Sequence, residues 1–260
     1  MKVLVTGATG HVGAQVVAQL TAAGVPVHPF ARGLGGDLRD PSTLPADVTA
    51  AFLLWPFTTA AGVQPVVDHL AAHVAHVVVL SAMNAGAGHW GEVEDRVAAS
   101  GVGWTFLRPG GFAANTLGWA DQVRTGVVHW PYGAAARSLI HEADIAAVAV
   151  RALTTPGHRS QRYELTGPAA ITQAEQVAAI GAAIGREVRW AELPPAAARA
   201  QLLTEWGDPA FVDGALAYWA TLVDHPEPVT HTVEQVTGVP ARTFAQWAAD
   251  HRVDFGGLPV

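Results

Sequence analysis

Cysteine is absent from this chain of 260 residues, and lysine occurs once, at Lys2. Without cysteine there are no disulfides, no thiolate metal ligands and no cysteine nucleophile. The single lysine lies at the start of the chain, so no later segment can use a lysine in its chemistry. Tyrosine is also scarce, with only Tyr132, Tyr163 and Tyr218. Reactions that depend on these side chains therefore have few places left in the sequence.

Charged residues are few and are more often acidic than basic. They make up 14% of the chain and leave a formal net charge of −7 at pH 7, while half of the residues are hydrophobic. This composition excludes a disordered chain. It also argues against binding to nucleic acids or anionic membranes, because both need basic residues. No signal peptide or membrane span is visible. We therefore expect a cytoplasmic protein, a monomer or homodimer, that acts on a small molecule.

Short apolar runs alternate with amphipathic segments through the first half of the chain. Strands are expected at 3–6, 25–30, 50–54, 77–81 and 104–108, and helices at 11–23, 64–75 and 91–100. The alternation predicts an α/β fold: a Rossmann-like, doubly wound parallel sheet with helices on both faces. The interval between Arg32 and Gly36 is too short for a helix, which predicts a short or irregular crossover there.

A different, mostly helical pattern begins after Gly111. Helices are expected at 114–125, 141–153, 172–185 and 241–251, a mostly helical segment at 195–225, and short strands at 127–130, 163–166 and 187–192. Thr172 and Glu175 have the spacing of a capping box. We predict an NAD(P)-binding Rossmann domain in residues 1–166, with 111–135 contributing to a cap, and a smaller substrate-binding region in residues 167–260.

A glycine-rich turn joins the first predicted strand to the first predicted helix. Gly7, Gly10 and Gly13 follow the pattern G-x-x-G-x-x-G. Glycine removes the Cβ atom where backbone must approach a pyrophosphate, and the helix N-terminus presents N–H groups and the positive end of its dipole. The turn therefore predicts a dinucleotide site. A purely structural turn is the alternative.

The end of the second predicted strand indicates which dinucleotide binds. An acidic residue there would bind the 2′-hydroxyl of NAD, but residues 28–32 contain none and end in Arg32. A guanidinium can instead meet a 2′-phosphate. We therefore expect NADP(H) to be preferred over NAD(H). The alternative is that Arg32 is a solvated loop residue.

Several further segments, together with the glycine turn, carry a family resemblance. They are residues 6–13, 36–38 with 40–42, 53–56, 100–109 with Phe112 and Asn115, 140–146 and 165–168. Together they resemble the NmrA-like branch of the atypical short-chain dehydrogenase/reductases over nearly the whole chain. Residues 6–13 and 100–109 are the specific matches, and the others are supportive.

The resemblance implies a doubly wound sheet with a small C-terminal substrate region, and it also implies a set of cofactor contacts. The glycine turn would touch the pyrophosphate, residues 37–38 the adenine, residues 54–56 the ribose, and residues 81–83 and 108–110 the nicotinamide. The expected cofactor residues are Gly7, Thr9, Gly10, His11, Val12, Gly13, Arg32, Asp37, Leu38, Leu54, Trp55, Pro56, Ser81, Ala82, Met83, Arg108, Pro109 and Gly110. Ordinary core packing is the alternative for Trp55 and Phe112.

The chain departs from typical short-chain reductases in its catalytic residues. Such enzymes use a tyrosine whose pKa is lowered by a lysine one helical turn later. The expected positions fall near Gly86 and Trp90, so the dyad is absent, as in many NmrA-like members. Any proton must come from another group or from water.

Candidate catalytic residues are His89, Ser81 and Tyr132. His89 titrates in a suitable range, and Glu92 lies three residues further along the same predicted helix, hence on the same face. The alternative is that both are solvated residues of the first helical turn. We expect Glu94 to be structural.

The candidate substrate-pocket residues are Asn84, Phe112, Asn115, Tyr132 and His141. Trp119, Trp130, Trp206 and Trp219 fall in or near the predicted cap, where they could line a pocket for an aromatic substrate or fill the cap's own core. His69 and His73 have a spacing that two metal ligands can share. No acidic residue lies at the sequence spacing that a third metal ligand would usually have. We therefore expect these histidines to lie on a solvated helix face and to bind no metal.

These observations favour an oxidoreductase: an NADPH-dependent reductase of a small apolar or aromatic carbonyl, quinone or imine. A quinone suits the missing Tyr–Lys dyad because its reduction needs little help from a strong acid. Two alternatives stay open. One is an NADP-binding redox-sensing regulator without turnover, and the other is a redox-neutral enzyme of secondary metabolism that catalyses cyclisation or dehydration.

Overall fold

The computed structural model describes residues 1–83, 85–86 and 88–258, which fall into two compact units. Unit 1 consists of Met1–Gly110, Glu142–Leu165 and Thr230–Pro240. Unit 2 consists of Gly111–His141, Thr166–Val229 and the chain from Ala241 onward. The predicted regions differ from this division in two places. All of Gly111–His141 belongs to unit 2, and Thr230–Pro240 joins unit 1 because its helix α9 (Thr232–Thr237) packs against α5 (Glu142–Thr154).

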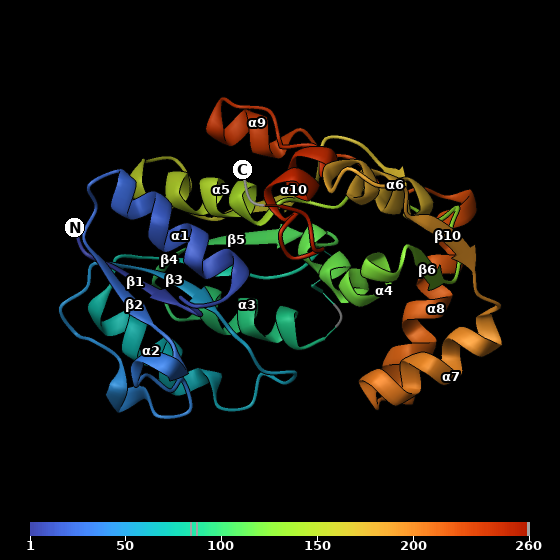
Figure 1. Ribbon diagram of the computed structural model, residues 1–260. Helices are drawn as coiled ribbons and strands as arrows, with labels where there is room; N and C mark the ends of the chain where they lie inside the picture. The colour runs from blue at the N-terminus through green and yellow to red at the C-terminus, as the bar shows by residue number, and fades with distance from the viewer. Residues whose placement is uncertain (84, 87, 259–260) are drawn as a thin grey trace. The chain divides into compact units, whose positions relative to one another are not determined.

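A six-stranded parallel sheet forms the centre of unit 1 (Figure 1). The strands lie in the order β2-β1-β3-β4-β5-β8. Their bounds are β1 Val3–Thr6, β2 Val27–Phe30, β3 Ala50–Leu54, β4 His76–Leu80, β5 Gly103–Pro109 and β8 Gln161–Leu165. The central strands are almost entirely buried, which explains their continuous valine and leucine runs. The predicted Rossmann-like fold class is confirmed.

Helices cover both faces of this sheet. Helices α1 (His11–Ala22) and α5 lie on one face, and α2 (Val63–His73) and α3 (His89–Ala99) lie on the other (Figure 1). The chain between β2 and β3 contains two 3-10 helices, η1 (Arg32–Leu34) and η2 (Pro41–Thr43), in place of an α-helix. The predicted irregular crossover is therefore confirmed.

Unit 2 is mostly helical and has two small strand pairs. Its helices are the 3-10 helix η3 (Ala113–Trp119), α4 (Ala120–Thr125), α6 (Gln173–Ala183), α7 (Pro195–Trp206), α8 (Pro209–Asp224) and α10 (Phe244–Asp250). Strand β6 (Val127–Trp130) pairs with β10 (Arg189–Glu192), and β7 (Ala136–Arg137) pairs with β9 (Ile171–Thr172). Both hydrogen bonds of the predicted capping box are present at the start of α6, so that prediction is confirmed.

The C-terminal half differs from the predicted elements in its details. The helix expected at 114–125 begins as the 3-10 helix η3, and the mostly helical segment at 195–225 is broken at Gly207, whose φ of +74° ends α7. Asp208 then caps α8 by accepting bonds from two backbone N–H groups. The short elements β7, β9 and α9 were not predicted, because they are held by tertiary contacts and lack a periodicity of their own. Within the described residues, no helix combines the length and hydrophobicity needed to cross a bilayer.

Candidate functional site

The glycine turn after β1 has the geometry that close packing of helix on strand requires. Gly7 adopts a φ of +64°, in the left-handed region that favours glycine. A Cβ atom at Gly13 would lie 2.1 Å from the carbonyl oxygen of Gly7. Helix α1 can therefore begin directly above the turn only if position 13 is glycine. Both residues serve the fold, whatever else the turn does.

Gly10 is different, because neither its backbone conformation nor any neighbour among the described residues requires a glycine there. Its φ is −86°, and a Cβ atom would meet only the Gly7 oxygen, at an ordinary 3.4 Å. It occupies the N-cap of α1, where no side chain caps the helix and no acidic residue lies in the first turn. Serine or aspartate would be favoured at such a position. The bare backbone leaves a cradle of N–H groups at the positive end of the helix dipole.

A cavity of about 450 Å³ opens in front of this turn within unit 1. Eight of the predicted cofactor residues line it: Gly7, Thr9, Gly10, Arg32, Asp37, Leu38, Leu54 and Pro56. Six residues that the sequence reasoning missed also line it: Phe30, Ala31, Gly33, Gly36, Arg39 and Phe57. The sequence-derived residues after β1, β2 and β3 thus meet at one edge of the sheet, as parallel strands require.

Arg39 was missed because its partner comes from a distant segment. Its guanidinium lies 4.6 Å from the centre of the Phe57 ring, and its backbone N–H donates to the Asp37 carboxylate at 2.9 Å. Gly36 lies against Phe30, where a Cβ atom would come within 2.5 Å of the ring. These contacts fix the loop that holds Arg32 and Arg39. The exposed guanidinium groups of Arg32 and Arg39 therefore line the cavity, where the 2′-phosphate of a bound NADP(H) is expected.

The end of β3 is tied to β1 by a side chain. The backbone N–H of Leu54 donates to Thr6 Oγ1 at 2.7 Å. The next residue, Trp55, is only 1% exposed, and its indole N–H donates to the carbonyl oxygen of Thr59 at 2.7 Å. Trp55 belongs to the hydrophobic core and does not line the 450 Å³ cavity. Its role in contacting the cofactor stays a prediction.

His11, Val12 and Gly13 lie at the start of α1, and only His11 is exposed. The predicted nicotinamide segments lie side by side after β4 and β5, since Ser81 N donates to Leu107 O and Met83 N donates to Pro109 O. They do not line the cavity in front of the glycine turn. The remaining members of these two segments are Ala82, Arg108 and Gly110.

A buried carboxylate holds these two segments together. Glu94 on α3 has a side chain that is only 3% exposed, and it accepts a hydrogen bond from Ser81 Oγ at 2.6 Å. It also accepts two hydrogen bonds from Arg108, at 2.9 Å from Nε and 2.5 Å from Nη2. Hydrogen bonding to Glu94 raises the pKa of Arg108. The Arg108 guanidinium thus compensates the buried carboxyl group of Glu94, and this group fixes the direction of the Ser81 hydroxyl.

His89 and Glu92, which the sequence places on one face of a helix, have different neighbours in the structure. His89 is the first residue of α3, is half-buried and lies 4.7 Å from the ring of Trp90. Glu92 lies 3.9 Å from Arg96, one turn further along, because opposite charges at this spacing attract each other. A catalytic role for His89 stays a prediction.

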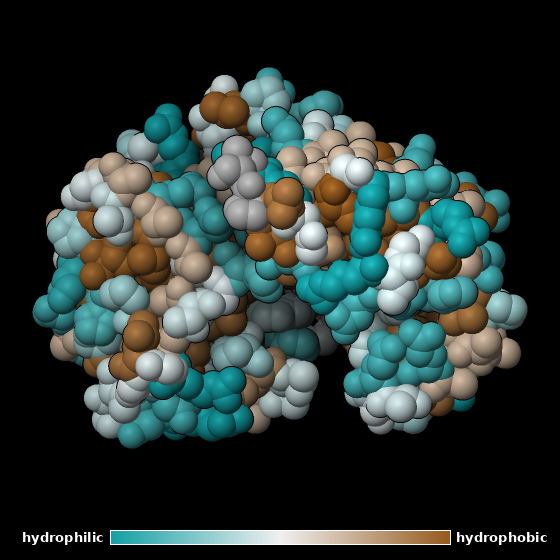
Figure 2. All heavy atoms as spheres, viewed as in Figure 1, coloured by the Kyte–Doolittle hydropathy of each residue, from teal (hydrophilic) through white to brown (hydrophobic). Residues whose placement is uncertain are grey.

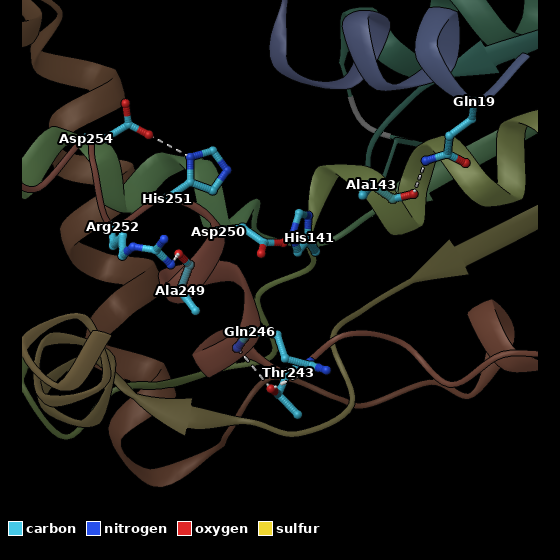
Figure 3. A network of polar contacts seen from close by, with 10 residues as sticks. All are labelled: Gln19, His141, Ala143, Thr243, Gln246, Ala249, Asp250, His251, Arg252 and Asp254. Atoms are coloured by element: carbon cyan, nitrogen blue, oxygen red, sulfur yellow. Dashed lines mark hydrogen bonds and ion pairs between the residues drawn. The ribbon is translucent and has the colours of Figure 1, made fainter. Parts of the chain in front are cut away.

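The predicted pocket residues are dispersed. Asn84 lies outside the described residues. His141 is only 3% exposed, and its Nε2 lies 3.2 Å from the Asp250 carboxylate (Figure 3). Tyr132 has a φ of +58° and packs against the core of unit 2. Phe112 forms a β-bridge with Ile140. Within the described residues, none of these three lines the large cavity of unit 2, whereas Asn115 does.

That cavity has a volume of about 720 Å³ and lies entirely within unit 2. All four tryptophans singled out in the sequence line it, together with Phe211, Tyr218, Arg137, Leu139, Gln173, Gln176 and Glu205, among others. Over helices α7 and α8, Figure 2 shows a surface on which hydrophilic and hydrophobic residues are mixed. Trp206 and Phe211 are 38% and 62% exposed, which is unusual for such large hydrophobic side chains.

The histidines considered as metal ligands make other contacts. The rings of His69 and His73 are stacked at 4.3 Å, and each ring is hydrogen-bonded to a backbone carbonyl. Among the residues that the structure describes, no cluster of three or more possible metal ligands occurs.

Two relatives match this chain over almost its full length. It is 37% identical to an NAD(P)H azoreductase from Xenophilus azovorans over 284 aligned positions, covering 98% of this chain and 99% of the relative. It is also 37% identical to a (4-alkanoyl-5-oxo-2,5-dihydrofuran-3-yl)methyl phosphate reductase from Streptomyces griseus, covering 97% and 99%. The chain belongs to the NmrA-like family of atypical short-chain dehydrogenase/reductases. The resemblance inferred for this family from the motifs is therefore confirmed.

Solved structures agree with the fold of this NmrA-like protein. An NADPH-dependent quinone oxidoreductase from Escherichia coli, in complex with NADPH, is 23% identical with a TM-score of 0.78, covering 96% of this chain and 99% of that one. The triphenylmethane reductase of Citrobacter sp., in complex with NADP(H), is 17% identical with a TM-score of 0.78, covering 97% and 100%. At these identities the likeness establishes the fold alone. No family model matches the chain.

Proposed function

We propose that this protein is an NADP(H)-dependent reductase that passes hydride to a small, conjugated acceptor such as a quinone, an azo compound or an imine. The observation that carries the proposal is Gly10. Neither backbone strain nor packing requires glycine at this N-cap, yet the position is bare and faces the 450 Å³ cavity. An approaching pyrophosphate supplies the missing reason.

The residues that line the cavity fit the rest of an NADP(H) molecule. The turn from Gly7 to Gly10 would hold the pyrophosphate through its N–H groups. Arg32 and Arg39 would meet the 2′-phosphate, since a guanidinium forms charge-assisted hydrogen bonds with phosphate oxygens. The carboxylate of Asp37 already accepts from the Arg39 backbone, so it is engaged within its own loop. Two cations favour NADPH over NADH.

When bound, the nicotinamide would supply hydride, and the protein would supply orientation and a dry site. Ser81 lies in one of the two segments expected beside it, and its hydroxyl proton is directed to Glu94. Because the Ser81 hydroxyl donates its proton to Glu94, which also accepts from Arg108, Ser81 offers a hydrogen-bond acceptor and not a proton. We propose that the proton comes from water, which suits acceptors whose reduced form spreads its charge over a conjugated system.

The relatives support this acceptor class by their names. The curated relative from Xenophilus azovorans is named for azo reduction, and the two solved structures are named for quinone and triphenylmethane reduction. All three names describe conjugated electron acceptors. The second curated relative is named for reduction of an unsaturated furanone-type phosphate.

Two measurements test the proposal. Calorimetric titration with NADPH and NADH should give tighter binding of NADPH. The variant Arg32→Ala should lower the affinity for NADPH much more than the affinity for NADH. Oxidation of NADPH, followed by absorbance, should then depend on an added quinone or azo compound. The variant His89→Gln tests the proton source. If water supplies the proton, as proposed, the rate of NADPH oxidation should stay unchanged, whereas loss of a general acid would lower it by about 10²- to 10⁴-fold. Binding without oxidation of NADPH by any acceptor would favour a redox-sensing regulator, and no binding of either nucleotide would refute the proposal.

A further inference from the structure

Trp130, one of the residues that line the cavity of unit 2, carries a buried donor for which the described residues provide no acceptor. Trp130 is 8% exposed, and its indole N–H is the one buried side-chain polar group for which the described residues provide no hydrogen-bond partner. Trp130 lines the 720 Å³ cavity. Burying an N–H group without a partner costs about 1–3 kcal/mol, so native structures rarely contain one that serves no purpose. A ligand atom with a lone pair would satisfy it.

Flat rings surround this donor. The Trp130 ring lies 6.0 Å from Trp119, 5.6 Å from Trp219 and 6.4 Å from Trp206, measured between ring centroids. Phe211 adds a further ring 5.3 Å from Trp206. The ring pairs meet edge-on or tilted, which is the preferred contact between aromatic groups. Walls of this kind are complementary to a planar aromatic molecule. The volume lies within the range of small-molecule sites, which is about 300–1,000 Å³.

Two buried glutamines add acceptors to the same cavity. Gln173 donates from its amide nitrogen to the carbonyl oxygens of Pro131 and Tyr132, at 3.1 Å and 3.0 Å. Gln176 donates in the same way to the carbonyl oxygen of Ile171, at 3.1 Å. These bonds determine which end of each amide is the nitrogen. The amide oxygens are therefore the groups that these two side chains can offer to a ligand, and such oxygens accept hydrogen bonds.

The charges that line the cavity are largely compensated. Arg137 donates to Glu227 at 3.1 Å, and Tyr218 donates its phenol proton to the same carboxylate at 2.7 Å. Glu205 is exposed, so water screens its charge. The remaining groups are one donor and two acceptors among aromatic walls. A neutral ligand fits this pattern better than an ion, which would lose its hydration without gaining a free counter-charge.

We infer that the cavity of unit 2 binds a neutral planar aromatic molecule that carries a hydroxyl or amino donor for the glutamine oxygens and a lone-pair acceptor for the Trp130 N–H. This inference goes beyond the proposed function, because it concerns the cavity of unit 2 alone. Binding itself needs no nucleotide, because every residue involved belongs to unit 2.

The test uses two probes that differ in one hydrogen-bond donor. 4-Hydroxyazobenzene is planar and has both a hydroxyl donor and lone-pair acceptors, whereas 4-methoxyazobenzene lacks the donor. Each is titrated into the nucleotide-free protein at neutral pH, and quenching of tryptophan fluorescence is followed. The hydroxyl probe should bind saturably, and about 2- to 12-fold more tightly than the methoxy probe, which corresponds to one neutral hydrogen bond.

Variants then assign the two contacts. Trp130→Phe keeps a ring but removes the N–H, so it should weaken both probes, by about 2- to 12-fold. Gln176→Leu should weaken only the hydroxyl probe and bring its affinity to that of the methoxy probe. Trp104→Phe, the same substitution in unit 1, should change neither. Should a variant fold poorly, the two probes on the wild-type protein still decide whether the donor matters.

Two results would overturn the inference. One is that neither probe binds saturably, and the other is that both probes bind equally and Trp130→Phe changes nothing. NADPH is titrated into the same preparations. If NADPH binds and the azobenzenes do not, the assignment of the unit 2 cavity fails while the proposed function survives. If the azobenzenes bind and NADPH does not, the proposed function fails while the assignment of the unit 2 cavity survives.

Discussion

Replacing Gly10 by serine should separate cofactor binding from folding. The backbone of Gly10 has a φ of −86°, which serine adopts without strain, and a Cβ atom there meets only one protein atom, at 3.4 Å. Serine is also a better N-cap than glycine, by a few tenths of a kcal/mol. The free energy of unfolding of Gly10→Ser should therefore equal or slightly exceed that of the wild type.

The same side chain should block the phosphate. It would occupy the cradle and compete for the N–H groups at the start of α1. Losing one charge-assisted hydrogen bond costs about 1.5–3 kcal/mol, which corresponds to about 10- to 150-fold weaker binding. Calorimetry with NADPH measures the affinity, and urea unfolding measures the stability. Gly118→Ser, at an exposed glycine of unit 2 with no atom near its Cβ, is the matched control; it should leave the affinity for NADPH unchanged and shift the stability by no more than about 0.5 kcal/mol, since Gly118 lies in a short 3-10 helix.

Gly13→Ala provides the opposite control on the same turn. Its Cβ atom would lie 2.1 Å from the Gly7 oxygen, so α1 or the turn must shift, and overpacking of this kind costs about 1–3 kcal/mol or more. A Gly10→Ser variant that binds NADPH as tightly as the wild type would contradict the role given to Gly10. So would a Gly10→Ser variant that loses as much stability as Gly13→Ala, because the glycine would then serve the fold.

Two predictions concern the stability of unit 1. Glu94→Gln leaves Arg108 without its counter-charge and should lower the free energy of unfolding by about 3 kcal/mol, whereas Glu92→Gln, at an exposed pair 3.9 Å apart, should cost less than about 0.5 kcal/mol in the same urea titration. Equal losses would contradict the role given to Glu94. Burial lowers the pKa of His76 below its ordinary value of 6.5, so the unfolded chain takes up that proton first as the pH falls. The contribution of His76 to stability is therefore complete above about pH 6.5 and is lost as the pH falls below that value. The urea concentration at the unfolding midpoint should be lower at pH 5 than at pH 7. The variant His76→Gln should show a smaller difference between the two pH values.

Local sequence patterns predicted the parts of the site that are close together in the chain. The glycine turn, the missing acid before Arg32, the irregular crossover and the capping box of Thr172 each involve a few consecutive residues. Backbone geometry and hydrogen bonding at that range depend on residue type alone, so the pattern is sufficient. The alternation of apolar runs likewise predicted the parallel sheet, since strands buried on both faces need such runs.

The remaining features depend on side chains that meet across the fold. Glu94 was expected to be structural, but its two partners, Ser81 and Arg108, lie 13 and 14 residues away on other elements. Arg39 was overlooked because Phe57, on which it rests, belongs to another loop. His89 and Glu92 share a helix face, yet Glu92 pairs with Arg96. In each case the outcome depends on distance and burial, which no spacing along the chain specifies.

Local patterns in the sequence were sufficient to predict the fold class and the position of the glycine turn after the first strand, because glycine and the apolar periodicity act through local geometry. The cavity lined by four tryptophans, the buried N–H of Trp130 and the hydrogen bonds of the Gln173 and Gln176 amide nitrogens arise from contacts between distant segments, so no local pattern predicted them. An aromatic residue has the same hydrophobicity in a core and in a binding site. What separates the two is whether the neighbouring atoms fill the space and satisfy every polar group.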